Sequence, residues 1–215
     1  MKKITHTLTL ILAICFTSNA QNSQIESLAG PRLGMVLIAP GIAADILHEG
    51  FGVEYQPDQI GDQDYIDPGS TGYAMTSLYG WQWEMRFADG GDITGIVEWV
   101  ALVGGMEKGL FLPSVSSLVG ARTASGFEFA MGPNLSLSGF GMVFGAGYNF
   151  KVGDLNLPVN IAFVPGVGRT IDREYMTAGP DGDPNTYSDN VYIEEEIETT
   201  TGSRFSITLG FNLGR

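Results

Sequence analysis

The chain has 215 residues, 24 of them acidic and 11 basic, and its formal net charge is −13. A chain this acidic repels the phosphate backbone of nucleic acids, which excludes them as partners. Its single cysteine, Cys15, excludes intrachain disulfides. No run of about 18 apolar residues occurs, so the sequence offers no transmembrane helix. The length suits one domain.

The first 20 residues have the three parts of a secretory signal peptide. A basic start precedes an apolar stretch from Leu8 to Phe16, which is too short to span a bilayer, and a small-residue cleavage site ends at Ala20. We therefore predict that residues 1–20 are an export signal, 21–30 a short N-terminal segment and 31–215 one folded domain.

Two strands are predicted in the first half of the chain on either side of a long connection. Residues 31–39 alternate apolar and small or polar side chains, as a strand does. Within 40–76, GIAADILHEG predicts one or two helical turns, and the rest, rich in Asp, Gly and Pro, predicts loop. The next strand covers 77–88.

The middle of the chain predicts three more strands, one of them ambiguous. Residues 93–104 and 126–134 alternate, the second more clearly than the first. In 110–121, Pro113 cannot donate a ladder hydrogen bond, and a closed barrel has no free edge to hide it. A bulge near Ser116 and Ser117 would keep this segment a strand; the alternative is a short helix.

The clearest alternation lies in the C-terminal half. Strands are predicted over 139–151, 155–164 and 204–213, with 166–202 as a second long connection. One face of these strands is large and apolar, and the other carries Gly, Asn, Ser, Thr and Ala. A soluble strand would expose Lys, Glu, Asp or Arg on its second face. The absence of charge there favours a lipid-facing outside and a crowded interior.

The connections support a particular barrel. Eight strands with short turns on one side and the long connections 40–76 and 166–202 on the other are typical of membrane barrels. We predict an all-β fold, an eight-stranded antiparallel up-and-down transmembrane β-barrel with two long external loops. Those loops should lie beside each other, because the last strand must pair with the first.

The segments FEFAMGPNLSLSGFGMVFGAGYNF, LNLPVNIAFVP, RFSITLGFNLGR and SLYGWQWEMRF carry a family resemblance. Together they resemble the small eight-stranded outer-membrane barrels of Gram-negative bacteria, of the OmpA-membrane-domain and OmpX type, and are similar to uncharacterised Bacteroidetes-type outer-membrane barrels. The resemblance implies an outer-membrane location, contact with outer-membrane lipid and insertion by the barrel assembly machinery.

Acidic residues concentrate in the long connections, with seven of the 24 acids in 40–76 and nine in 166–202. They predict a hydrated surface, or one that attracts divalent cations or, through them, surface polysaccharide. One stretch spaces oxygen ligands as a calcium loop does, although it lacks that loop's later Gly and Glu. The ligands of this candidate Ca²⁺ site are Asp181, Asp183, Asn185 and Asp189. No other cofactor is expected.

Two groups of strand residues are candidates for defined roles. Alternation points four charged side chains into the lumen, where they form either an ion-paired plug or a polar path for protons or small solutes: Glu84, Arg86, Glu98 and Glu128. Aromatic rings on the opposite face are expected at the membrane interfaces: Tyr79, Trp81, Trp83, Trp99, Tyr148 and Phe150.

The function expected from these patterns is a structural or surface-interaction role without enzymatic activity. One alternative is a soluble periplasmic lipocalin-like barrel that binds a hydrophobic ligand. Another is a narrow pore, or a barrel enzyme acting on lipid with His48 as its base, oriented by Asp45 or Glu49. No serine stands out by motif as a nucleophile for such an enzyme.

Overall fold

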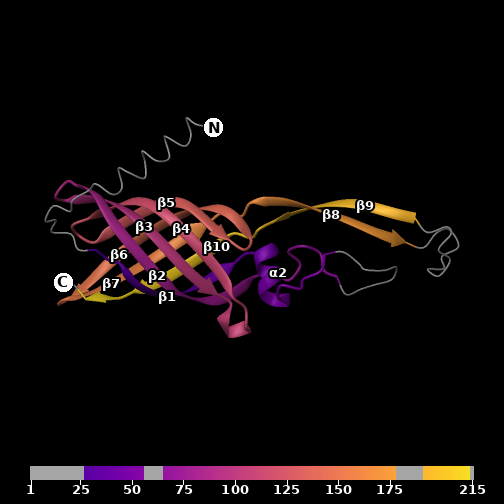
Figure 1. The fold of residues 1–215 in the computed structure, drawn as a ribbon, viewed down its shortest axis with the longest axis horizontal. Helices are drawn as coiled ribbons and strands as arrows, with labels where there is room; N and C mark the ends of the chain where they lie inside the picture. The colour runs from indigo at the N-terminus through magenta and orange to yellow at the C-terminus, as the bar shows by residue number, and fades with distance from the viewer. Residues whose placement is uncertain (1–26, 56–64, 178–190, 214–215) are drawn as a thin grey trace, which may run out of the picture.

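The computed structural model describes residues 27–55, 65–177 and 191–213. Its main sheet is a closed antiparallel barrel of eight strands, in which neighbours along the chain pair and the last strand pairs with both β1 and β7 (Figure 1). The strands are β1 (Gly30–Ile38), β2 (Ala74–Asp89), β3 (Ile93–Gly104), β4 (Leu112–Thr123), β5 (Phe127–Ser136), β6 (Gly139–Val152), β7 (Leu155–Val164) and β10 (Arg204–Gly210), which β11 (Asn212–Leu213) extends.

The structure confirms the predicted all-β class, the closed antiparallel barrel and all eight strands. Short turns join β2 to β3, β4 to β5 and β6 to β7 at one end, which we call the turn end. Both long connections leave the opposite end, which we call the loop end, as predicted. The connection from β3 to β4 is also at the loop end and contains a short 3-10 helix, η1 (Met106–Lys108).

Side chains alternate between the two faces of every barrel strand. On β10 the outward Phe205, Ile207 and Leu209 are 43–49% exposed, whereas the residues between them point inward. Large apolar side chains are exposed in the same way around the barrel. No helix in 27–55, 65–177 or 191–213 is long and apolar enough to cross a membrane.

The ambiguous segment 110–121 is a strand, β4, shifted to Leu112–Thr123. Pro113 is tolerated because it has no partner in β5. The pairing of β4 with β5 starts one residue later, at Ser114 and Ser136. The bulge expected near Ser116 and Ser117 was wrong, since the β4–β5 register is the same on both sides of these residues.

Two further prolines lie inside strands, where the ladder has gaps. Pro133 is paired with Met142 of β6. On its other side it has no partner in β4, because the β4–β5 pairing is interrupted between Asn134 and Met131. Pro158 pairs with β6 and lies where the partner strand is interrupted between β10 and β11. Each proline therefore has its missing N–H on a side where no ladder bond forms. The register shift that the barrel does contain is in β2, between Arg86 and Ala88.

A helix covers the loop end of the barrel. The predicted helical turns in 40–76 are α2 (Ile42–Glu49), whose N-terminus lies at Gly41. A Cβ on Gly41 would come within 2.5 Å of the backbone at Thr200 and Gly202, so glycine permits this close approach. The buried face of α2 forms one apolar cluster with residues of β1 and β2: Ala43, Ala44, Leu47, Val36, Ile38, Ala74 and Leu78.

The second long connection is not the loop that we expected over 166–202. It contains a two-stranded antiparallel hairpin, β8 (Gly168–Thr177) and β9 (Val191–Thr200), which projects beyond the loop end along the long axis of the molecule (Figure 1). One face of this hairpin carries five acids: Asp172, Glu174, Glu194, Glu196 and Glu198. The register places Asp172 opposite Glu196 and Glu174 opposite Glu194, an arrangement of like charges that weakens a strand pair.

The two long connections lie side by side, as closure of the barrel requires. Arg173 of β8 is buried; it donates from Nε to the Tyr55 carbonyl oxygen at 2.7 Å and pairs with Asp67 at 2.8 Å. Its guanidinium also lies over the ring of Tyr65, 4.8 Å from the centroid. This single side chain thus holds the first connection against the hairpin.

Replacement of Arg173 by alanine should loosen that contact and leave the barrel intact. Loss of charge-assisted hydrogen bonds of this kind is worth about 1.4 kcal/mol or more. We therefore expect amide hydrogen exchange in β8 to accelerate about tenfold, and exchange in β5 and β6 to stay unchanged. The exposed Arg169, on the same strand, provides the control variant Arg169→Ala. Equal acceleration in both variants would contradict the anchoring role of Arg173.

Candidate functional site

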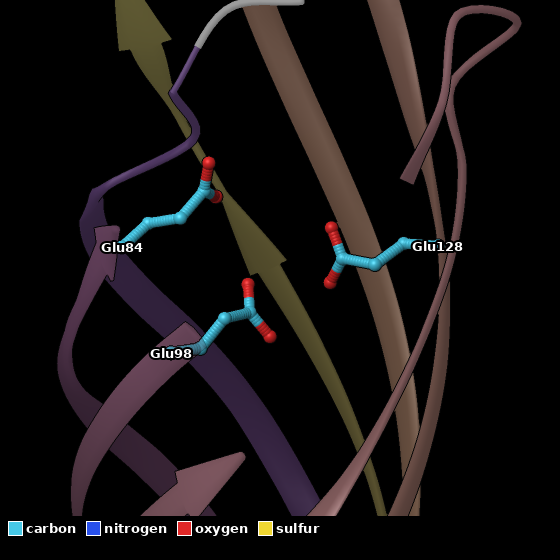
Figure 2. Close-up of side chains that lie close together, drawn as sticks. All are labelled: Glu84, Glu98 and Glu128. Carbon is cyan, nitrogen blue, oxygen red and sulfur yellow. The ribbon is translucent and has the colours of Figure 1, made fainter. Parts of the chain in front are cut away.

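The barrel interior at the turn end holds a cluster of charged side chains. Glu84 of β2, Glu98 of β3 and Glu128 of β5 point toward one another, with carboxylate oxygens all within 4.8 Å (Figure 2). Strand register explains the meeting, because Glu84 is paired with Glu98 across β2 and β3. Three of the four predicted lumen residues are therefore together. The fourth, Arg86, is half-buried two residues beyond Glu84.

The cation at the centre of this cluster is Arg122, which β4 positions opposite Glu128. Its Nη1 donates to Glu84 at 2.8 Å and its Nε to Glu128 at 2.8 Å. Its Nη2 lies 3.7 Å from Glu98. The four side chains are almost inaccessible, with between 0 and 7% of their area exposed. Charges this buried are stable only when they are paired.

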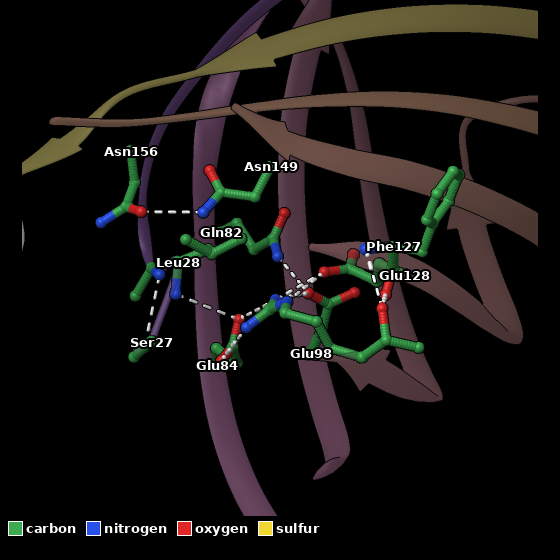
Figure 3. A network of polar contacts seen from close by, with 12 residues as sticks. Ser27, Leu28, Gln82, Glu84, Glu98, Phe127, Glu128, Asn149 and Asn156 are labelled. Carbon is green, nitrogen blue, oxygen red and sulfur yellow. Dashed lines mark hydrogen bonds and ion pairs between the residues drawn. The ribbon is translucent and has the colours of Figure 1, made fainter. Parts of the chain in front are cut away.

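The network continues through Gln82 and Leu28 toward the N-terminal segment (Figure 3), and a second arginine takes part in it. Gln82 donates from Nε2 to Glu98 and accepts at 3.0 Å from Nε of Arg32. Arg32 in turn donates to the Leu28 carbonyl oxygen at 2.7 Å, and the Leu28 N–H donates to Glu84 at 3.2 Å. Arg32 fits because Gly210 has no side chain; a Cβ there would come within 2.1 Å of its Nη1.

The N-terminal segment itself helps to close the turn end. Leu28 is 2% exposed, and the Asn212 amide donates to the carbonyl oxygens of Ser27 and Ala29 at 3.0 and 2.7 Å. Nearby, Asn149 donates to Asn156 at 2.8 Å. The network therefore joins β1, β2, β3, β4 and β5 to the segment that precedes the barrel.

The three carboxylates have the composition of a divalent-cation site, since hard cations prefer oxygen ligands. However, the guanidinium of Arg122 contacts all three of them and so occupies the position that a metal ion would take. The arrangement suits a structural seal: paired, buried charges that fill the lumen between the strands.

The predicted interface aromatics all lie on the outer face. Tyr79, Trp81, Trp83 and Phe150 are exposed, and Trp99 and Tyr148 are half-buried against neighbours. Trp83 is paired with Trp99 across β2 and β3. The Tyr148 ring makes edge-to-face contacts with Phe127 and Phe150, at centroid distances of 4.9 and 4.8 Å.

The candidate calcium loop, with Asp181, Asp183, Asn185 and Asp189, lies outside the described residues, as does the predicted signal peptide. His48 is described: its Nε2 is 3.1 Å from the Tyr73 carbonyl oxygen on the exposed side of α2. Neighbouring Asp45 is buried and directed elsewhere, toward the connection between α2 and β2.

Asp45 organises that connection rather than orienting His48. It accepts hydrogen bonds from Thr71 Oγ1 at 2.7 Å, the Gly69 N–H at 2.6 Å and the Tyr55 hydroxyl at 3.1 Å. Burial, and then the charge of Asp45, raise the pKa of the Tyr55 hydroxyl above its ordinary value. On the neighbouring η1 turn, hydrogen bonds from Thr76 and Ser77 lower the pKa of Glu107 to about 2.

We call the linked polar side chains at the turn end the turn-end cluster: Glu84, Glu98, Glu128, Arg122, Gln82 and Arg32. The sequence analysis missed three of these residues. Arg32, Gln82 and Arg122 were not assigned to the cluster, although each alternates with outward neighbours along its strand and so has an inward position. This alternation was the feature of the sequence that could have identified them as lumen residues. What the sequence lacks is the register between strands, which places Arg122 opposite Glu128 on the neighbouring β5 and within reach of Glu84 on β2, across β3.

No protein-family model, curated protein or solved structure matches the chain.

Removal of the central guanidinium should destabilise the barrel. Arg122→Met leaves three buried carboxylates facing one another, and breaking a buried ion pair costs about 3–5 kcal/mol of unfolding free energy. The exposed Lys108 gives a control, Lys108→Met, with an expected change of about 0.5 kcal/mol or less. Urea titration of both variants measures this difference.

A second variant tests whether the stability lost in Arg122→Met is due to the unpaired charges of the carboxylates rather than to the changed shape of the Arg122 side chain. Adding Glu84→Gln, Glu98→Gln and Glu128→Gln to Arg122→Met should recover part of the lost stability, because the buried charges are then gone. If Arg122→Met were as mild as Lys108→Met, the cluster would not be the seal that its geometry indicates.

Proposed function

We propose that the chain is an outer-membrane β-barrel of a Gram-negative bacterium, with a structural or surface-interaction role and no enzymatic activity. The observation that carries this proposal is the inverted distribution of side chains. Arg32, Arg122 and Glu98 are inside and at most 2% exposed, whereas Phe205, Ile207 and Leu209 are outside and 43–49% exposed. A soluble barrel of lipocalin type would have its apolar side chains inside and its charged ones outside.

Several further observations support the membrane assignment. Soluble monomers rarely expose apolar patches that encircle the molecule. A closed barrel satisfies its backbone hydrogen bonds without water, which lipid requires. The predicted signal peptide supports export, and export to the outer membrane would bring the chain to outer-membrane lipid and the barrel assembly machinery.

The same proposal gives the two ends different roles. The ion-paired cluster closes the lumen at the turn end, which favours a plugged barrel over a narrow pore. The loop end would face outward, where the acidic face of the β8–β9 hairpin is the candidate contact surface. Its charge suits divalent cations, which could bridge it to anionic surface polysaccharide.

Cell fractionation tests the location directly. The full chain should appear in the outer-membrane fraction and should change mobility on a gel when the sample is boiled, because a folded barrel resists detergent until it is heated. Recovery as a soluble periplasmic protein without such a shift would overturn the proposal and favour the lipocalin-like alternative.

A single substitution distinguishes lipid from water outside the barrel. Ile207→Arg at mid-strand should lower the unfolding free energy by about 2–4 kcal/mol if Ile207 faces lipid. Val191, which is similarly exposed but on the projecting hairpin, gives the matched control Val191→Arg, expected to change it by about 0.5 kcal/mol or less. Both are measured by urea titration of the chain in lipid vesicles. Equal, small effects would contradict contact with lipid.

A further inference from the structure

Between the turn-end cluster and the loop end, the barrel interior contains a cavity of about 160 Å³. Cavities of roughly 150 Å³ with apolar walls hold guests the size of benzene. Most of the wall area of this cavity is apolar, although Ser116, Asn160, Ser206 and Thr208 also line it. The aliphatic side chains come from β3, β4, β5, β6 and β7: Val100, Leu102, Leu118, Ala130, Val143 and Val164. Such a space gains by taking up a hydrocarbon.

The two polar ends of this cavity differ in charge. Gln82, Glu98 and Glu128 of the turn-end cluster line one end. Arg204, the first residue of β10, lines the cavity near the loop end, together with Ser136, the last residue of β5, and Ser138 of the β5–β6 turn. The carboxylates at the first end already use the guanidinium of Arg122, so an anionic head group would be attracted to Arg204 at the other end. Charge therefore sets the direction in which an amphiphile would enter.

Arg204 has unused capacity to bind an anion. Its Nη1 donates to Ser136 Oγ at 2.8 Å and its Nη2 to Asn134 Oδ1 at 3.2 Å. Its Nε is buried without a hydrogen-bond partner, and no carboxylate within the described ranges forms an ion pair with it. In contrast, Arg122 and Arg173 each pair with acids. A guanidinium of this kind presents two parallel donors to a carboxylate or phosphate.

A second cation lies at the same rim. The Arg169 guanidinium is against Gly139, so close that a Cβ at Gly139 would approach its Nη2 to 2.5 Å. Gly139 begins β6, directly after Ser138 of the cavity wall. The rim formed by the β5–β6 turn and the start of β10 is thus locally positive in a chain whose net charge is −13.

We propose that the barrel interior binds a single-chain anionic amphiphile, with its acid group at Arg204 and its alkyl chain in the apolar cavity. The acid group would take the free Nε–H and share the Nη donors, and the chain would extend toward Leu118 and Val143. Because the cavity is inside the barrel, this binding does not depend on whether lipid or water surrounds the outer face.

Methyl NMR of the full chain in phosphatidylcholine nanodiscs tests the proposal with octanoate as the probe. Octanoate should give saturable shifts of the inward methyl groups of Val100, Leu102 and Val143. The outward methyl groups of Leu209 report partitioning into lipid and should change without saturation. Each methylene added to the chain should tighten binding about fourfold until the cavity is full.

Head-group charge is tested first on the unaltered chain, so the result does not depend on any variant folding. Octyltrimethylammonium has the same alkyl chain and the opposite charge, and it should bind at least tenfold more weakly than octanoate. Equal affinity of the two probes, or no saturable shift with octanoate, would overturn the proposal.

Three variants then locate the two parts of the site. Arg204→Gln should weaken octanoate binding at least tenfold and leave octanol binding within about twofold, whereas Arg204→Lys should keep most of the octanoate affinity. Ala130→Phe fills the cavity from an inward position and should abolish the binding of both probes. If Arg204→Gln bound octanoate as tightly as the unaltered chain does, the head-group site would be elsewhere and the proposal would be wrong.

Discussion

The pairing of β10 with both β1 and β7 closes the sheet, and the rest of the structure depends on that closure. An open sheet would expose two edges of unpaired backbone donors and acceptors and would leave its inner face in water. Closure gives the chain a separate interior, in which charges can be held away from solvent if they are paired. It also brings the chain's two long connections together at one end.

The interior that closure creates is divided along the barrel axis. Near the turn end, Arg122 compensates buried carboxylates and the segment at Leu28 completes the seal. Near the loop end, aliphatic side chains line a cavity, and α2 covers part of its mouth. Outside, the large side chains exposed along the barrel strands are mostly apolar. A chain built in this way is stable in a medium that does not compete for hydrogen bonds, which is why we propose lipid as its surroundings.

Local alternation was sufficient to predict the barrel strands and the inward position of Glu84, Glu98 and Glu128. It failed on the β8–β9 hairpin, because Glu195 lies between Ile193 and Ile197 on their face, and the resulting run of three glutamates over 194–196 hides the two-residue period. The neighbouring sequence also could not show that Pro113 fits in a strand, because this depends on where the pairing between β4 and β5 ends. The cavity and the role of Arg204 depend on all eight strands at once and have no signature in any single segment.

The most direct test of the account uses the chain's own tryptophans. All three, Trp81, Trp83 and Trp99, are on the outer face of β2 and β3. In vesicles of brominated phosphatidylcholine, their fluorescence should be strongly quenched relative to vesicles of the unbrominated lipid, because bromine quenches on contact. Water-soluble iodide should quench them little. Unchanged emission in brominated vesicles together with efficient quenching by iodide would place the outer face in water and contradict the account.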